Sequence, residues 1–409
     1  MNTAYNKTRY QRGFWSLIAT LFQGAFSDNL FKWILIYLLK ESVLPSDTET
    51  IQKIPSYAGM IFAIPFIIFP GIFGALSDRV SKQKILEWTK LIEIGVMSAG
   101  LLAVLSGSPT FLWVVFFLMA TQSAMFGPGK YGILPEAMPE SRLSWSNGIM
   151  QMMTMLAIIG GVVVSGFLYE KLSAQGHVHY ISILLIVLAI VGWITSRSIF
   201  KPPAADPKRE IPLNPWSGMR EAFKAYRADK WLGLSILAYI FFWFSGAIHL
   251  ANIPAFAFIN LGLTEAENGY LLGGLSLGIA LGAFTTGYVS RGKIEVGLIP
   301  LGAIGMALFC GLLALPDLTF NYALVLLAGL GFFSGMFNVP LAATIQQRSP
   351  SRIRGSIMAT TNMLTFIGMF VGSAMMLVLA DLEMAPSSIF FVTAIMTLLV
   401  GLYISYLLP

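Results

Sequence analysis

Twelve long apolar segments are the feature of this sequence that most constrains its fold. Each is long enough to cross about 30 Å of hydrocarbon as a helix that rises about 1.5 Å per residue. They lie at about residues 14–39, 54–77, 84–106, 110–135, 145–168, 179–200, 232–258, 267–290, 295–315, 319–341, 354–380 and 385–408. Their side chains lack the period-two alternation of a membrane β-barrel, so the sequence predicts an all-α integral membrane protein with twelve transmembrane helices.

The composition agrees with a polytopic membrane protein. Of 409 residues, 56% are hydrophobic and 11% are charged, against about 25% charged residues in an ordinary soluble domain. The one cysteine, Cys310, lies in an apolar segment, so no intramolecular disulfide can form, and nothing in the sequence indicates a metal site or a cofactor. The first apolar segment is too long for a signal peptide and has no small-residue cleavage site, so we expect it to remain as the first helix.

Polar stretches divide the chain and indicate its orientation. The longest, residues 201–231, separates a predicted N-terminal six-helix bundle (residues 1–200) from a C-terminal one (residues 232–409). Most of the 26 Lys and Arg residues lie in or beside the N-terminal tail, this linker and the loops that follow even-numbered segments. The positive-inside rule therefore places both termini and the linker in the cytoplasm. The net charge of +6 then follows from topology and attraction to anionic lipid, and does not indicate nucleic-acid binding.

Two pairs of loops repeat at nearly the same spacing. The stretch "GALSDRVSKQK" (Gly74–Lys84) aligns with "GYVSRGK" (Gly287–Lys293) at an offset of 213. The stretch "PGKYGILPEAMPESR" (Pro128–Arg142) aligns with "PLAATIQQRSPSRIR" (Pro340–Arg354) at an offset of 212. Because both pairs of loops recur at nearly the same offset, the sequence predicts duplicated, pseudo-symmetric six-helix halves with a central cavity between them. In such an architecture, rocking of the two halves opens the cavity to each side of the membrane in turn.

With these features the chain resembles the major facilitator superfamily. The stretch "GALSDRVSKQKIL" is similar to its loop signature Gly-x-Leu-x-Asp-Arg-x-Gly-Arg-Lys, with Gly74, Asp78 and Arg79 in place. Gly74 lets two helices approach closely, and Asp78 can accept hydrogen bonds at a helix N-terminus or pair with a basic residue of the other half. We therefore expect these three residues to form a gating loop that latches the outward-facing state. The alternative is an ordinary charged turn.

Three further stretches resemble the lysophospholipid transporter (LplT) family of this superfamily, and the similarity covers essentially the whole chain. They are "FSDN" (Phe26–Asn29), "GPGKYGILPE" (Gly127–Glu136) and "VPLAATIQQRSP" (Val339–Pro350). The resemblance implies inward flipping of lysophospholipids, chiefly lysophosphatidylethanolamine, across the bacterial cytoplasmic (inner) membrane for re-acylation. It also implies an acyltransferase partner, which we expect to be a separate protein because the chain ends directly after the last segment. Surrounded by membrane lipids, the protein is expected to be a monomer.

Charged residues within apolar segments are the candidate site residues. Asp28 lies about 14 residues into the first segment, where an unpaired charge costs roughly 2.5 to 3.5 kcal/mol. Either it forms a local ion pair with Lys32, one turn away, or Asp28 and Asn29 bind a cationic or hydrogen-bonding headgroup. Glu93 supplies a second carboxyl group, which with Asp28 can support proton coupling or can simply pair with Lys90. The sequence does not fix which way the neutral side chains of Gln23, Gln122, Gln151 and Asn362 face.

Two other segments contribute candidates for phosphate binding. If the fourth helix continues through "KYGILPE", Lys130 lies about two turns inside its end and can hold a phosphodiester as a point charge. Otherwise it extends to the interface like any lysine at a helix end. The resemblance implies an arginine in the seventh segment, which has none, and His249 and Asn252 are the nearest substitutes. A hydrogen-bonded histidine in the helix core remains an equal alternative for His249.

The sequence does not indicate a membrane enzyme such as an acyltransferase. Its histidines are His177, His179 and His249, without the His-x-x-x-x-Asp spacing of an acyltransferase. No Cys/His metal set, P-loop or nucleotide-binding glycine motif is present in the sequence. We therefore predict a carrier. Besides the lysophospholipid flippase, the alternative is a proton-coupled exporter of amphiphilic drugs or small solutes, because an amphipathic cavity suits both.

Overall fold

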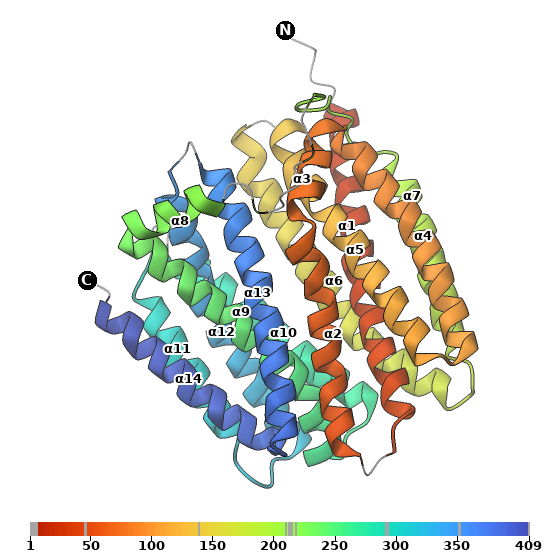
Figure 1. Ribbon diagram of the computed structural model, residues 1–409, viewed down its shortest axis with the longest axis vertical. Helices are drawn as coiled ribbons and strands as arrows, with labels where there is room; N and C mark the ends of the chain where they lie inside the picture. Colours follow the sequence, from red (N-terminus) through yellow and green to blue (C-terminus); the bar gives the residue numbers. More distant parts are fainter. Residues whose placement is uncertain are drawn as a thin grey trace. The chain divides into compact units, whose positions relative to one another are not determined.

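The computed structural model of the protein describes residues 7–44, 47–137, 140–208, 211, 216, 219–290, 294–350 and 353–407 (Figure 1). All regular secondary structure in these ranges is helical. The elements are α1 (Lys7–Glu41), α2 (Thr48–Ile68), α3 (Pro70–Arg79), α4 (Lys82–Ser106), α5 (Pro109–Ala137), α6 (Glu140–Ser173), α7 (His179–Ser196), α8 (Met219–Ala228), α9 (Lys230–Ala255), the π-helical turn η1 (Phe256–Asn260), α10 (Glu265–Ser290), α11 (Leu298–Leu313), α12 (Phe320–Arg348), α13 (Arg354–Asp381) and α14 (Pro386–Leu407).

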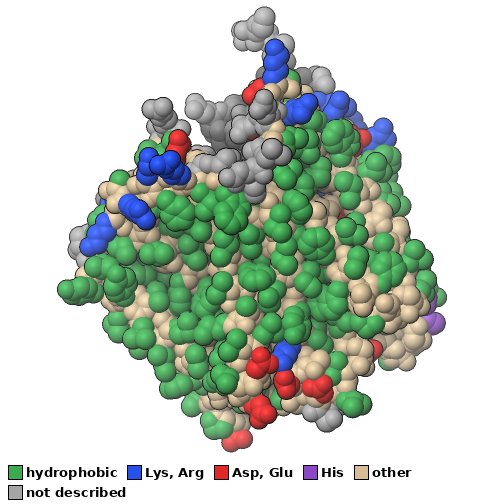
Figure 2. All heavy atoms as spheres, viewed as in Figure 1, with side chains coloured by type: hydrophobic (Ala, Val, Ile, Leu, Met, Phe, Trp, Pro, Cys, Tyr) green, Lys and Arg blue, Asp and Glu red, His purple; other side chains and the backbone are tan. Residues whose placement is uncertain are grey.

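These helices agree with the twelve predicted segments. Ten of the described helices are long and apolar enough to cross a membrane by length and composition. The apolar α11 is shorter, with 16 residues, and α1 has 35 residues but includes Asp28 and Lys32. Hydrophobic side chains cover most of the visible face, and charged side chains gather at the helix ends (Figure 2). The prediction of a multi-pass, all-α membrane protein is therefore confirmed.

Three local features differ from uninterrupted segments. The second segment is divided into α2 and α3 at Phe69, because Pro70 begins α3 and cannot donate a backbone hydrogen bond to the turn before it. In the seventh segment Pro254 precedes the π-helical turn η1, which widens the end of the helix. The polar linker contains α8, a short helix with exposed Arg220 and Lys224 and with Ala222 buried.

The described residues group into two compact units. Unit 1 comprises Met1–Leu35 and Ile68–Pro215, and unit 2 comprises Ile36–Ile67 and Trp216–Pro409. The last residues of α1 and nearly all of α2 therefore pack with helices from the second half of the chain. The predicted domains, residues 1–200 and 232–409 with the linker between them, are sequence halves rather than contact clusters, and that partition stays a prediction.

Each unit has its own helix packing. In unit 1, α4 packs against both α5 and α7, and one cluster of its core contains Leu17, Leu21, Leu86 and Ile133. In unit 2, α9 packs against α13, and α12 packs against α10 and α11. Figure 1 shows α9 and α13 side by side. Unit 1 thereby brings polar residues of α1, α4 and α5 together.

Glycines set the closest of these contacts, between α10 and α12. A Cβ atom on Gly278 or Gly282 would collide with the carbonyl oxygens of Ala328 or Phe332. On the facing helix, a Cβ atom on Gly331 would collide with a carbonyl oxygen of α10. The backbones therefore touch directly, as small residues four apart allow in membrane helices.

Candidate functional site

Asp28 lies on α1 and faces α5. Its Oδ2 accepts a hydrogen bond of 2.5 Å from the Ser123 hydroxyl of α5, and the side chain is half-buried. The alternative of an Asp28–Lys32 ion pair is wrong for this structure, because the bond to Ser123 holds the carboxylate toward α5. The Lys32 ammonium instead lies 5.6 Å from the centre of the Trp33 ring.

Next to Asp28, a fully buried ion pair joins Lys90 and Glu93. These residues are one turn apart on α4, their charged atoms are 2.6 Å apart, and each side chain is 1% exposed. Glu93 therefore has the Lys90 partner that the sequence left open. With Lys90 and Glu93 opposite in sign and in contact, the pair carries no net charge into the core.

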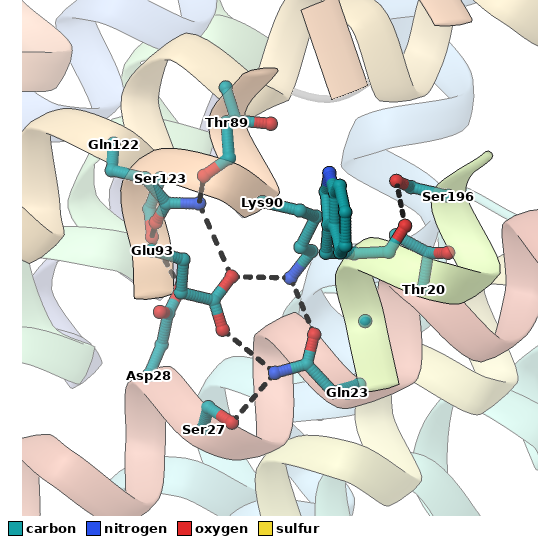
Figure 3. Close-up of polar contacts among 12 residues, drawn as sticks. Thr20, Gln23, Ser27, Asp28, Thr89, Lys90, Glu93, Gln122, Ser123 and Ser196 are labelled. Carbon is teal, nitrogen blue, oxygen red and sulfur yellow. Dashed lines mark hydrogen bonds and ion pairs between the residues drawn. The ribbon is translucent and has the colours of Figure 1, made fainter. Parts of the chain in front are cut away.

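Two glutamines complete this network (Figure 3). Gln23 of α1 accepts from the Lys90 ammonium at 2.8 Å and donates to Glu93 Oε1 at 2.7 Å. Gln122 of α5 donates to the Thr89 carbonyl oxygen at 3.2 Å and to Glu93 Oε2 at 3.4 Å. Buried charges are tolerated only when their remaining donors and acceptors are also satisfied. The network therefore ties α1, α4 and α5 together.

Two glycines make room for the network. A Cβ atom on Gly24 of α1 would lie 2.6 Å from the Lys90 ammonium, and one on Gly192 of α7 would collide with the Gln23 side-chain oxygen. The Lys90 ammonium also lies 5.1 Å from the centre of the Phe126 ring. The pair consequently occupies space that any larger residue at either glycine would fill.

Charges on α4 and α5 act on the Asp28 carboxylate. Glu93 repels it, whereas Lys90 and Lys130 attract it. Lys130 lies seven residues after Ser123, on the same face of α5, and α5 continues to Ala137. The expectation that Lys130 lies about two turns inside this helix is therefore confirmed. Its role in phosphate binding stays a prediction.

Asn29 is engaged within its own helix. Its amide donates to the Ala25 carbonyl oxygen at 2.8 Å, and the side chain is half-buried. Gly161 of α6 packs here, because a Cβ atom on it would lie 2.6 Å from the Phe26 carbonyl oxygen and 3.1 Å from Asn29 Cβ. Asn29 thus contacts α6, while Asp28 contacts α5.

His249 and Asn252 lie in the interior of unit 2, on α9. The His249 ring nitrogen Nε2 lies 3.2 Å from the Thr393 hydroxyl of α14 and 3.4 Å from Cys310 of α11. Asn252 donates to the Pro386 carbonyl oxygen at 2.8 Å. These contacts favour the hydrogen-bonded core interpretation of His249. Substrate binding by either residue stays a prediction.

The residues of the predicted gating loop, Gly74, Asp78 and Arg79, lie within α3, which ends at Arg79 shortly before α4 begins. Asp78 pairs with Lys82 at 3.9 Å, Arg79 is exposed, and the Asp78 carbonyl oxygen accepts from the Asp206 backbone N–H at 2.9 Å. A Cβ atom added to Gly74 would have no described atom within 4 Å. The close helix approach expected at Gly74 is therefore not found within unit 1. The latch itself stays a prediction.

Comparison with known proteins places the chain in a family. The family model described as Major Facilitator Superfamily matches residues 17–373. The chain belongs to this superfamily. Among solved structures, a POT family transporter in complex with 5-aminolevulinic acid matches with a TM-score of 0.76 and 13% identity, over 97% of this chain and 96% of that one. The nucleoside transporter NupG (D323A mutant) matches with a TM-score of 0.69 and 12% identity, over 98% and 100%. These likenesses show the fold alone.

Curated relatives have a more specific name. A protein of Cronobacter sakazakii named lysophospholipid transporter LplT is 27% identical over 368 residues, which cover 88% of this chain and 86% of the relative. One of the same name from Escherichia fergusonii is 25% identical over 413 residues, covering 98% and 97%. The superfamily and these relatives are transporters, which confirms the prediction of a carrier rather than an enzyme.

The sequence identifies the charged residues of unit 1 and offers Lys90 as a partner of Glu93, but it does not identify their neutral partners. Ser123 and Gln23 are neutral and lie 95 and 70 residues from the carboxylates they contact. A weak signal was present, because Gln23 and Gln122 are strongly polar side chains within otherwise apolar segments. Their facing depends on how α1, α4 and α5 pack, which periodicity alone does not specify.

Proposed function

We propose that this protein is a lysophospholipid transporter that flips its substrate across the membrane by alternating access. The observation that carries the proposal is the bonding of the Asp28 side chain. Among the described residues, its carboxylate accepts a hydrogen bond from the Ser123 hydroxyl and forms an ion pair with no cation. A carboxylate within a membrane helix is costly and rare, and such residues usually mark a functional site. The relatives named lysophospholipid transporter LplT, matched over most of the chain, support the substrate class.

The headgroup chemistry of lysophosphatidylethanolamine suits this part of unit 1. Its ammonium would pair with Asp28, and its phosphodiester would lie near Lys130, whose charge already acts on Asp28. Glu93 is already neutralised by Lys90, so the pair leaves Asp28 as the carboxylate available to the substrate. A single acyl chain would remain in an apolar environment while the headgroup crosses.

Direction and location belong to the same proposal. In this proposal the protein lies in the bacterial cytoplasmic membrane. Both termini and the linker would face the cytoplasm, because most Lys and Arg residues lie in the N-terminal tail, the linker and the loops on the same side. Transport would then run inward and deliver lysophospholipid to a separate acyltransferase for re-acylation. The gating loop of Gly74, Asp78 and Arg79 would close the cytoplasmic side in the outward-facing state.

A proton-coupled exporter of amphiphiles is the second candidate. It is favoured by the presence of two carboxyl groups, Asp28 and Glu93, within one polar cluster of unit 1 (Figure 3). Coupling would require one of them to take up and release a proton in each cycle. The ion pair of Glu93 with Lys90 opposes this, because its proton would have to displace a bonded ammonium.

Reconstituted liposomes test the proposal directly. Flipping of a labelled lysophosphatidylethanolamine is measured with and without an imposed proton gradient, for the wild type, Asp28→Asn and the control Asp317→Asn. Asp317 is exposed in a turn with φ of 56°, a conformation that asparagine also adopts, so the control makes the same chemical change away from the site.

We expect the wild type to flip without a gradient, Asp28→Asn to lose at least about tenfold in rate, and Asp317→Asn to be unchanged. Flipping that occurs only with a proton gradient would support the exporter class instead. An unaltered rate for Asp28→Asn would remove Asp28 from the site. No flipping by any variant, with folded protein, would overturn the proposed substrate.

A further inference from the structure

A cavity of about 500 Å³ lies within unit 2, apart from the polar cluster of unit 1. It is formed where α9 and α11 begin and α12 and α14 end. Its walls are mainly apolar, and the residues lining it include Trp231, Leu234, Ile299, Leu341, Arg348 and Ile404. Its volume lies within the roughly 300 to 1,000 Å³ of small-molecule sites in proteins.

The cavity adjoins the lipid-facing surface of unit 2. On three of the helices that form it, side chains within one or two turns of the lining residues are largely exposed: Leu237 of α9 by 64%, Leu301 of α11 by 47% and Tyr403 of α14 by 60%. In a multi-pass membrane protein, exposed apolar side chains of this kind contact acyl chains. A lipid acyl chain is therefore an apolar group that can enter the cavity from the neighbouring surface.

A fixed guanidinium lies on the cavity wall. Arg348 Nη1 donates to both carboxylate oxygens of Asp229, at 3.0 and 3.2 Å. Asp229 is in turn held by the backbone N–H groups of Trp231 and Leu232. Burial acts to raise the pKa of Asp229, but these hydrogen bonds and the Arg348 charge outweigh it and hold the pKa below its ordinary value. The carboxylate therefore stays charged and keeps Arg348 in place.

This arrangement leaves hydrogen-bond donors to spare. Among the described residues, Nε and Nη2 of Arg348 make no hydrogen bond, and the side chain is 41% exposed. A guanidinium donates two parallel N–H groups to a phosphate. Lys230, at the start of α9, is also exposed. The charge at the rim is complementary to an anion.

We propose that the cavity binds an anionic phospholipid of the surrounding bilayer, with an acyl chain among the apolar side chains and the phosphate on Arg348. This lipid is a resident of the bilayer rather than the transported substrate, because the site lies wholly within unit 2 and shares no residue with Asp28 and its partners. A zwitterionic lipid fits less well, since its cationic group would lie near Lys230.

Native mass spectrometry of the purified full-length protein tests this proposal. The protein is titrated with phosphatidylglycerol or with phosphatidylcholine of the same acyl chains, and the bound fraction is compared. Arg348→Gln removes the phosphate ligand, while Thr344→Phe fills the cavity from its wall and leaves the charge intact. Arg227→Gln is the matched control, because it removes the same charge from exposed α8 and does not line the cavity.

We expect the wild type and Arg227→Gln to retain phosphatidylglycerol over phosphatidylcholine, and Arg348→Gln and Thr344→Phe each to weaken phosphatidylglycerol binding about tenfold. Asp28→Asn should bind it like the wild type, which separates this site from transport. Equal retention of both lipids, or unchanged binding in folded Thr344→Phe, would overturn the proposal. If Thr344→Phe does not fold, the smaller change Ala238→Val serves as the cavity-filling variant with the same expected loss.

Discussion

Lys90 and Glu93 illustrate how much a single buried charge depends on its partner. Each side chain is 1% exposed, and Gln23 bonds to both. Removal of one charge leaves the other buried without compensation, which typically costs about 3 to 5 kcal/mol. Removal of both charges, with Glu93 changed to Gln, leaves no uncompensated charge and keeps a side-chain oxygen to which Gln23 and Gln122 can donate. The stability of unit 1 should therefore depend on the balance of the pair more than on either charge.

A double-mutant cycle measures this dependence. We expect Lys90→Met to lower the free energy of unfolding by about 3 kcal/mol or more, and Lys90→Met/Glu93→Gln to lower it by less than Lys90→Met alone. Unfolding is followed by helical circular dichroism in detergent with increasing denaturant. Additive losses for Lys90→Met and Glu93→Gln would show that the two charges are not coupled, contrary to their contact at 2.6 Å.

At the residue scale, the sequence predicted which side chains matter but not which contacts they make. Asp28 and Glu93 stand out because a carboxylate within an apolar segment has few explanations. Helical spacing makes Lys32 a possible partner of Asp28, yet the side chain that bonds Asp28 is Ser123 from a different helix. Spacing along one helix identifies possible neighbours, whereas the packing of α1 against α5 selects the actual one.

At the scale of helices, close packing between α10 and α12 is decided by glycine. A Cβ atom on Gly282 would run into the Phe332 carbonyl oxygen, and backbone cannot move aside as a flexible side chain can. Gly287, one to two turns later on the same helix, has no described atom within 4 Å of its Cβ position. Alanine substitution at each of these two glycines therefore separates the effect of helix packing from the intrinsic helix preference of alanine.

We expect Gly282→Ala to lower the free energy of unfolding by about 1 to 3 kcal/mol through forced separation of the helices. Gly287→Ala should be neutral or stabilising by up to about 1 kcal/mol, because alanine is the better helix former. Thermal unfolding of both variants in the same detergent provides the comparison. If Gly287→Ala lowers the free energy of unfolding as much as Gly282→Ala does, contact between the two backbones is not the cause of the loss.

The end of α1 is held to η1 and α10 by a compact polar contact within unit 2. The Lys40 ammonium pairs with Glu265 and lies 3.8 Å from the centre of the Phe258 ring. Beside it, the Asn268 amide donates to the Tyr37 hydroxyl at 3.1 Å. The contact thus joins helices from different halves of the sequence within one compact unit.

Charge reversal tests whether the Lys40–Glu265 pair stabilises the fold. We expect Lys40→Glu to lower the unfolding midpoint, because it places two carboxylates together, and Lys40→Glu/Glu265→Lys to recover most of the loss. Both side chains are partly exposed, 23% and 17%, so the coupling should be about 1 kcal/mol. If the double variant is no more stable than the single one, direct pairing does not account for the contact.

At this scale the apolar segments predicted the helices well, and local chemistry explains the exceptions. The break at Pro70 follows from a residue that cannot donate a hydrogen bond, and that signal was present in the sequence. The assignment of α2 to unit 2 was not predictable, because it depends on contacts such as Phe66 stacking on Phe366 at 4.2 Å between ring centres. Sequence order predicts the elements but not the neighbours of each element.

For the whole molecule, segment count, loop repeat and family resemblance predict the same fold, and the superfamily match confirms it. Orientation in the membrane rests on charge asymmetry, which is a statistical tendency of loops. In unit 1 the loop between α6 and α7 and the stretch after α7 lie at opposite ends of α7, so they should be exposed on opposite sides of the membrane. Gln175 and Lys208 are exposed residues in these two stretches.

Single cysteines at these positions test the orientation. The native Cys310 is fully buried, so Cys310→Ser gives a background without reactive thiols at little structural cost. In that background we expect a membrane-impermeant maleimide to label Gln175→Cys in intact cells, and to label Lys208→Cys only after the membrane is permeabilised. The reverse pattern would invert the orientation, and with it the inward direction of transport, because the headgroup site near Asp28 would then receive substrate from the opposite leaflet.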